Sequence, residues 1–155
     1  MTAGFEKVNY RNLNAKQKEL HNFQKIAATL AEYGFNCLKL ADDWQGADFL
    51  AYHLNGTTLK IQLKSRITIS KKYRNDIWIA FPYKRHWYLV RHDHLVEKIG
   101  KATNWLNSKE WKTKGLYHSL SINQDLLSSL AENCLGEVYG SLAGDEIKAM
   151  KASAV

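Results

Sequence analysis

Residues 46–64 read GADFLAYHLNGTTLKIQLK, and this stretch decides the fold. Asn55 and Gly56 form a turn signal between two runs of strand-forming residues, 47–54 and 57–70. In the second run, every apolar side chain falls on an odd position and the even positions are polar or cationic. That period of two indicates a half-buried strand. The stretch therefore predicts a β-hairpin with one apolar face and one polar face.

The register of this hairpin decides which polar side chains meet. A two-residue turn at Asn55-Gly56 would place Asp48 opposite Leu63, on the other face of the hairpin from Gln62. A three-residue loop over 54–56, with a glycine bulge, places Asp48 opposite Gln62 instead. We favour the three-residue loop because it stacks the apolar side chains of both strands on one face. Lys64, two residues after Gln62, then projects from the same polar face.

Asp48, Gln62 and Lys64 would together suit the hydrolysis of a phosphodiester. That reaction needs a metal ion, a positive charge opposite the phosphate, and help in deprotonating the attacking water. Asp48 is a ligand suited to a hard divalent cation, and Gln62 can add a neutral carbonyl oxygen. Lys64 can orient or activate the water and offset negative charge. The sequence therefore predicts a metal-dependent hydrolytic site on the polar face.

Glu19 is the candidate for a second carboxylate. It lies in a predicted helix over 14–33, and its spacing places it on the apolar stripe of that helix. An acid buried on such a stripe is costly without a partner or a metal. The alternative position for Glu19 is the solvent-exposed first turn of the helix.

Other candidate sites carry weaker signals. Asp42 and Asp43 could bind a metal, but adjacent acids in a loop more often cap or turn the chain, and we predict a loop over 42–46. His92 and His94 have a spacing that metals use, but at a strand end they are more often simply exposed. No set of His and Cys residues has zinc spacing. The nucleophile elbow G-x-S-x-G and the Gly-rich phosphate loop are both absent from the sequence.

The charge distribution favours a polyanionic partner. The net charge is +7, and residues 57–91 hold nine basic side chains and a single acid. The segment 70–75 interleaves cations, hydroxyls and one aromatic ring, which suits a sugar–phosphate backbone and a stacked base. An ordinary solvated surface is the alternative. The candidate nucleic-acid-binding residues are Lys60, Arg66, Lys71, Lys72, Tyr73, Arg74, Lys84 and Arg85.

The size and composition indicate one domain. A chain of 155 residues with 45% hydrophobic content can build a single core, which we expect over 14–135, with a loosely held tail over 136–155. No apolar run reaches the 18 residues of a membrane span, and residues 1–6 lack a signal-peptide core. The two cysteines are far apart and unaccompanied, so we expect them to be reduced in a cytoplasmic protein. The element pattern predicts an α/β fold with a mixed sheet flanked by helices.

The order of Glu19, Asp48, Gln62 and Lys64 resembles the PD-(D/E)XK nuclease superfamily, over roughly residues 14–90. Within it, residues 40–64 look like a group of small uncharacterised bacterial proteins. The amide at Gln62, which gives a QxK variant of the motif, is similar to that of an intron-encoded homing endonuclease branch.

The resemblance implies a restriction-endonuclease-like fold with a mixed central β-sheet flanked by helices. It also implies Mg²⁺ (or Mn²⁺) as cofactor, double-stranded DNA as partner, and a homodimer or homotetramer. The chain departs from the motif in two places. Ala47 replaces a proline, which is a minor change. Gln62 replaces an acid, which removes one negative charge from the metal site and should lower its metal affinity.

Three functions fit these observations. The first is a metal-dependent endonuclease acting on DNA. In it, Asp48 and Gln62 bind the metal with support from Glu19, and Lys64 orients or activates the attacking water. The second is a catalytically silent nucleic-acid-binding protein of the same fold. The third is a protein-interaction module whose positive charge does not bind nucleic acid. A silent binder would ignore magnesium and the loss of Lys64, and an interaction module would not bind nucleic acid at about 50 mM salt.

Overall fold

The computed structural model of this protein describes residues 3–74 and 76–137. Most of the predicted loose tail, from residue 138 onward, lies outside the described residues. The elements in chain order are η1 (Tyr10–Asn12), α1 (Ala15–Ala31), β1 (Phe35–Trp44), β2 (Ala47–His53), β3 (Thr58–Leu63), β4 (Ile67–Ser70), β5 (Ile77–Tyr83), β6 (His86–Arg91), α2 (His92–Ala102), η2 (Trp105–Asn107), α3 (Lys109–Lys114), β7 (Leu116–Ser119), α4 (Gln124–Ser129), η3 (Ala131–Asn133) and β8 (Cys134–Glu137).

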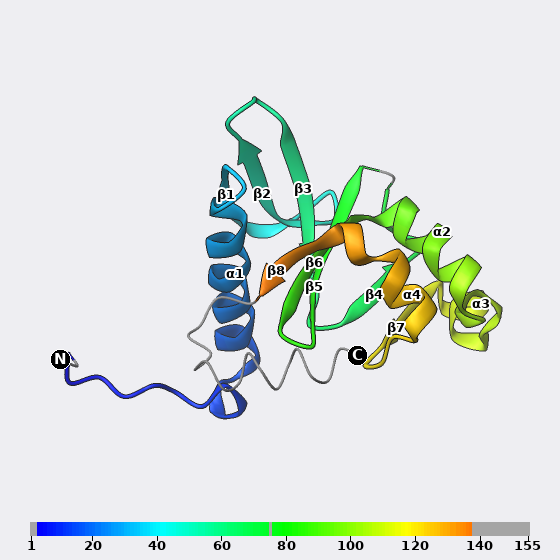
Figure 1. Cartoon of the computed structure of the whole chain (residues 1–155), viewed down its shortest axis with the longest axis horizontal. Helices are drawn as coiled ribbons and strands as arrows, with labels where there is room; N and C mark the ends of the chain where they lie inside the picture. The colour runs from blue at the N-terminus through cyan, green and yellow to red at the C-terminus, as the bar shows by residue number, and fades with distance from the viewer. Residues whose placement is uncertain (1–2, 75, 138–155) are drawn as a thin grey trace.

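A six-stranded sheet in the order β1-β2-β3-β5-β6-β8 forms the centre of the fold (Figure 1). The pair β3–β5 is parallel, and the other neighbouring pairs are antiparallel. Strands β4 and β7 form a separate antiparallel pair. This confirms the predicted α/β class with a mixed central sheet flanked by helices.

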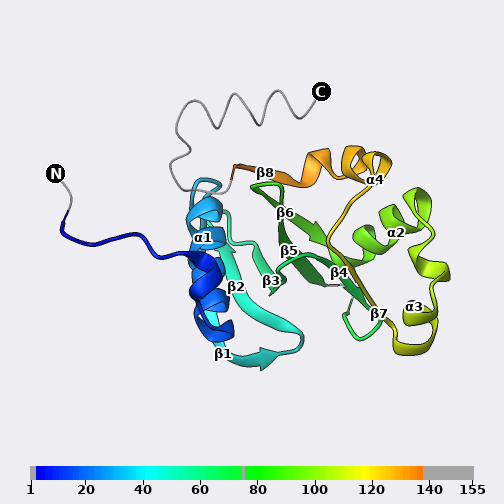
Figure 2. The same cartoon turned by 90° about the horizontal axis from the view of Figure 1, so that it is seen from below.

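Helix α1 covers one face of the sheet, on the side where β1, β2 and β3 lie (Figure 2). Asn14 caps it through a capping box with Gln17, at the start of the helix predicted over 14–33. The buried side of the helix places Ile26 and Leu30 against a cluster that includes Phe49 and Ile61. The odd positions of β3 therefore face α1, and its even positions face the other way.

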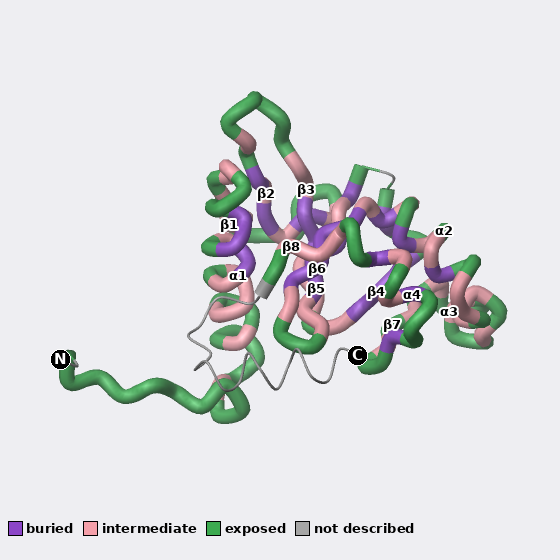
Figure 3. The backbone as a smooth tube through the Cα atoms, viewed as in Figure 1, coloured by how far each residue is buried: buried purple, intermediate pink, exposed green. Residues whose placement is uncertain are grey.

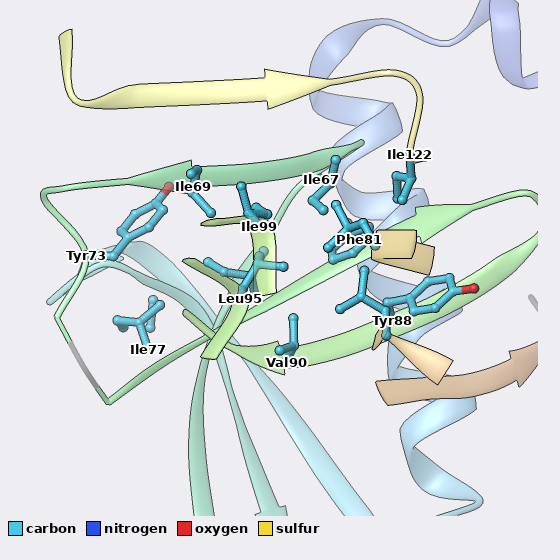
Figure 4. Close-up of a cluster of buried hydrophobic side chains, with 14 residues drawn as sticks. Ile67, Ile69, Tyr73, Ile77, Phe81, Tyr88, Val90, Leu95, Ile99 and Ile122 are labelled. Carbon is cyan, nitrogen blue, oxygen red and sulfur yellow. The ribbon is translucent and has the colours of Figure 1, made fainter. Parts of the chain in front are cut away.

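The second core lies on the opposite face of the sheet, beneath α2, α4 and the β4–β7 pair (Figure 4). Its members include Ile77 and Ile79 of β5 and Leu95 and Ile99 of α2. In Figure 3 the buried stretches run through the central strands, whereas the segment before α1 is exposed. No helix in residues 3–74 and 76–137 combines the length and the apolarity that a membrane crossing requires.

Two predicted boundaries are wrong. The predicted strand over 57–70 is two strands, because the chain leaves the central sheet after Leu63 and pairs with β7 from Ile67 onward. All four residues of β4 are buried, so its alternating sequence does not mark a solvent face. The predicted loop over 42–46 shrinks to a turn at residues 45–46, because β1 continues through Trp44.

Candidate active site

The β2–β3 hairpin adopts the register of the three-residue loop. Phe49 lies opposite Ile61, and Ala51 lies opposite Leu59. The N–H of His53 donates to the carbonyl oxygen of Thr57 at 2.8 Å, which closes the loop over 54–56. Gly56 has a φ of 90°, the left-handed conformation that a glycine bulge uses. The predicted register is therefore confirmed from Phe49–Ile61 to Tyr52–Thr58. That Asp48 and Gln62 share the polar face stays a prediction.

Asp48 is held at the start of β2 by the neighbouring strand. Its Oδ2 accepts a hydrogen bond of 2.8 Å from the backbone N–H of Leu63. Burial raises the pKa of the Asp48 carboxyl, while the Leu63 hydrogen bond and the charge of Lys64 act in the opposite direction. A desolvated carboxylate beside a lysine is a typical setting for metal binding or proton transfer.

Gln62 provides the observation that tests whether a metal fits here. The side chain is only 7% exposed, and its Oε1 has no hydrogen-bond partner among the described residues. An unpaired buried carbonyl oxygen costs about 1–3 kcal/mol, so a site that leaves one is built for a ligand or an ordered water. Magnesium and manganese take such oxygens as ligands. The donor set of Asp48 and Gln62 therefore fits a hard divalent cation.

Carboxylates alone do not make this site. Within residues 3–74 and 76–137, no three His, Cys, Asp or Glu side chains lie close enough together to hold a metal ion. A metal bound at this hairpin would need amide and water oxygens in addition to carboxylates. The oxygen of Gln62 supplies the amide ligand.

Lys64 follows β3 directly, and its N–H donates to the carbonyl oxygen of Ala80 at 2.9 Å. Its Nζ lies 5.9 Å from the centre of the Tyr73 ring, a cation–π distance. Lys64 also lines a cavity of about 270 Å³ together with Glu19, Asn22 and Ser65. Lys64 thus lines an open cavity, and its charge acts on the Asp48 carboxyl.

Glu19 does not have the burial that was predicted for it. Its side chain is 45% exposed, and it forms ion pairs with Lys39 at 2.9 Å and Lys16 at 3.7 Å. The hydrogen bond from Lys39 lowers the pKa of the Glu19 carboxyl. Glu19 does turn toward the sheet, since Lys39 belongs to β1, but the helix end extends past the core. The exposed position that we had considered as the alternative is the one that Glu19 occupies.

Tyr73 is not the exposed base-stacking residue that the sequence suggested. It belongs to the buried cluster that Figure 4 draws and is 7% exposed. Its ring contacts that of His92 edge-on, with 5.2 Å between the ring centres. Burial raises the pKa of the Tyr73 phenol, and the charges of Asp48 and Asp43 act in the same direction. The Tyr73 ring therefore belongs to the apolar core and lies next to Lys64.

Some of the predicted nucleic-acid-binding residues before β5 are exposed, whereas another is already paired within the protein. Lys71, Lys72 and Arg74 are exposed in the segment that leads into β5. The ammonium of Lys71 lies 5.2 Å from the Trp111 ring, and that of Lys72 lies 5.6 Å from the Tyr73 ring. Lys60, in contrast, is committed to contacts within the protein, with Asp76 at 2.7 Å and Gln45 at 3.0 Å.

A second basic group lies at the other end of β5. Lys84 and Arg85 form the β5–β6 turn with φ values of 46° and 64°. Lys84 and Arg66 line a common cavity of about 370 Å³ with Ser65 and Tyr83. The cations thus form two groups at the two ends of β5, and Lys64 follows the strand beside it.

Asp43 was considered as a metal ligand from the sequence but was expected in a loop. Its charge raises the pKa values of both the Asp48 carboxyl and the Tyr73 phenol. The paired acids at 42–43 were read as loop residues, and only the continuation of β1 brings Asp43 to this hairpin. No signal in the sequence predicted that irregularity.

Comparisons with known proteins add one structural likeness. No protein-family model matches the sequence, and no curated protein matches it. Among solved structures, the chain is similar to a bacterial homing endonuclease, I-Ssp6803I, with a TM-score of 0.44 and 12% sequence identity. The similarity covers 72% of this chain and 78% of that protein. We transfer no residue role from that protein to this chain.

Proposed function

We propose that this protein is a metal-dependent endonuclease that cleaves phosphodiester bonds in DNA, with the site arrangement of the PD-(D/E)XK nucleases. The observation that supports it most directly is the unpaired, buried Oε1 of Gln62, next in sequence to Leu63, whose backbone N–H holds Asp48. A buried oxygen without a partner, a desolvated carboxylate and an ammonium are what a metal-assisted hydrolysis requires.

Each residue has a role in this proposal. Asp48 and Gln62 hold Mg²⁺ or Mn²⁺, which when bound polarises a phosphate oxygen and makes coordinated water more acidic. Lys64 faces the phosphate, orients the attacking water and offsets the charge that develops on the phosphoryl oxygens. The hydrogen bond from Leu63 to Asp48 keeps one carboxylate oxygen in place and leaves the other for the metal. Glu19 lines the Lys64 cavity and acts from its rim through water.

The two basic groups indicate how the substrate lies. Strand β5 separates Lys72 and Arg74 from Lys84 and Arg66. At roughly 3.3 Å per residue, its length exceeds the roughly 12 Å width of a DNA major groove. Cations at both ends could therefore contact phosphates on both sides of a duplex, with Lys64 between them. This spacing favours double-stranded DNA as the substrate.

A nicking assay on supercoiled plasmid with Mg²⁺ or Mn²⁺ tests the proposal. Wild type should convert plasmid to open-circular form, and Asp48→Asn and Lys64→Ala should each reduce the rate at least a hundredfold. Lys101→Ala is the matched control, since Lys101 lies on α2 in an exposed pair with Glu97. Equal cleavage by all four proteins would identify a contaminating nuclease or another site.

A catalytically silent DNA-binding protein is the second candidate function. The pairing of Glu19 with Lys39 favours it, because that ion pair withdraws one carboxylate from the predicted metal site. Such a protein would bind duplex DNA with strong salt dependence, and its affinity would be indifferent to Mg²⁺ and to Lys64→Ala. A gel-shift titration with and without Mg²⁺ distinguishes it from the nuclease.

A further inference from the structure

Two cavities adjoin at Ser65, in the bend where the chain leaves β3 for β4. The cavity of about 270 Å³ lies on the side of α1, and both Lys18 and Lys64 line it. The cavity of about 370 Å³ lies on the side of the β5–β6 turn, and both Arg66 and Lys84 line it. These cations therefore follow one line over the surface, from α1 past the end of β3 to the β5–β6 turn.

Glu19 also lines the cavity on the side of α1, but its charge is already balanced by other lysines. Its carboxylate forms ion pairs with Lys39 at 2.9 Å and with Lys16 at 3.7 Å. Neither of these two lysines is among the residues that line the cavity. Lys18 and Lys64 form no such ion pair in the part of the chain that the structure describes. Their charges are therefore available to an anion that enters the cavity.

The ammonium of Lys18 is held in place by the segment before α1. Its Nζ lies 5.6 Å from the centre of the Tyr10 ring, a cation–π distance. The Tyr10 hydroxyl oxygen accepts a hydrogen bond of 2.9 Å from Nδ2 of Asn22, and the ring lies 5.2 Å from that of His21, measured between ring centres. Tyr10 and Asn22 both line the cavity. A lysine that is held in this way loses less side-chain entropy on binding an anion than a freely moving one.

We propose that Lys18 binds the backbone phosphate next to the one that Lys64 faces, and that Tyr10 positions Lys18 for this contact. The strand then runs through both cavities, past Ser65, to Arg66 and Lys84. Successive phosphates of one strand suit this line because the cavities adjoin and cations line each of them. This inference deepens the proposed nuclease function and rests on it for the position of the cleaved phosphate.

The salt dependence of duplex binding without divalent metal tests the inference, because neither the metal site nor cleavage enters that measurement. Fluorescence anisotropy of a labelled duplex in EDTA gives Kd between about 50 and about 300 mM salt. We expect Lys18→Ala to lower the slope of log Kd against log salt by about 1, the change for one lost phosphate contact, and Lys18→Arg to keep the slope. Lys16→Ala is the matched control, since Lys16 carries the same charge on the same turn of α1 but is 77% exposed and does not line the cavity. Its slope should stay close to that of wild type.

A double-mutant cycle tests whether Tyr10 acts through Lys18. Tyr10→Leu should weaken duplex binding about threefold, within the range of an exposed cation–π contact. Adding Tyr10→Leu to Lys18→Ala should cause no further loss, because the contact is then already absent. Losses that add in the double variant overturn the positioning role. Circular dichroism and melting curves establish that each variant is folded.

The outcomes separate this inference from the proposed function. An unchanged slope in Lys18→Ala, or equal slope changes in Lys16→Ala and Lys18→Ala, overturns the phosphate contact, while plasmid nicking by wild type still supports the nuclease. A lower slope in Lys18→Ala alone, in a protein that does not nick plasmid, supports the contact and removes the nuclease proposal. Absence of duplex binding by wild type at about 50 mM salt overturns both.

Discussion

The carboxylate of Asp48 accepts a 2.8 Å hydrogen bond from the backbone N–H of Leu63, the residue between Gln62 and Lys64. This bond links the acid of one strand to the strand that carries the amide and the amine. A shift of either strand by one residue would break the bond and send the three side chains to different faces. The site is therefore as well ordered as the hairpin that carries it.

Replacing Asp48 by Asn should stabilise the metal-free protein while abolishing cleavage. Burial raises the pKa of the folded-state carboxyl, so ionising it costs stability at neutral pH. Asn keeps an oxygen to accept the Leu63 hydrogen bond and carries no charge. The melting temperature at pH 7.5 should rise by a few degrees.

The pH dependence of this effect follows from the direction of the shift. The cost of ionisation is fully present above the folded-state pKa and disappears as the pH falls below the ordinary Asp pKa. The melting temperatures of wild type and Asp48→Asn should therefore converge in acid. Thermal unfolding from pH 7.5 down to pH 3.5 checks this, and an unchanged or lower melting temperature of the variant at pH 7.5 would contradict it.

Replacing Gln62 by Glu should tighten metal binding. The change puts a second charge beside Asp48 in a buried position, which lowers stability without metal and raises affinity for a divalent cation. We expect Mn²⁺ to bind at least tenfold more tightly, and saturating Mn²⁺ to raise the melting temperature more than in wild type. Gln62→Leu is the opposite control, since it removes the ligand oxygen and the unpaired polar atom together. An unchanged Mn²⁺ affinity in Gln62→Glu would exclude this side chain as a ligand.

Tyr73 should act as a positioning residue for Lys64. The ring lies within cation–π distance of the ammonium groups of Lys64 and Lys72, at 5.9 Å and 5.6 Å. Tyr73→Leu should slow single-turnover cleavage about fivefold, the loss expected for a contact worth about 1 kcal/mol. Tyr73→Phe keeps the ring and should retain most of the activity. If the two variants lose activity equally, the hydroxyl group is the important part and the ring is not.

The two basic groups should contribute separately to the salt dependence of DNA binding. Removing two phosphate contacts lowers the slope of log Kd against log salt by about 2. We expect that change both in Lys72→Ala/Arg74→Ala and in Arg66→Ala/Lys84→Ala. Fluorescence anisotropy with a short duplex between 50 and 300 mM salt measures it. A slope that changes in only one double variant would restrict the DNA-binding surface to one end of β5.

Much of the hairpin could be predicted because its determinants are local. The turn at Asn55-Gly56 and the stacking of apolar side chains favoured the register that the structure has. Glu19 could not be predicted in the same way. Its spacing indicated the correct side of α1, but whether that side is buried depends on where the helix extends past the sheet. The ion pair with Lys39 joins residues from two elements, and no pattern within one element specifies it.

The basic residues within 57–91 could also be predicted only in part. Its composition indicated an anion-binding surface, but the sequence does not show which cations are already paired. Lys60 is held by Asp76 and Gln45, whereas Lys72 and Arg74 are exposed. The aromatic ring of Tyr73 is buried because β4 and α2 close over it.

The sequence by itself determined the register of the hairpin that carries Asp48 and Gln62, because side-chain alternation and turn chemistry act over a few residues. Only the tertiary structure decided how exposed Glu19 is and which lysines it pairs with. Residues 40–43 of β1 leave regular pairing opposite Asp48, and Lys39 pairs with Glu19 beside the cavity that Lys64 also lines. Those positions depend on which elements meet in space.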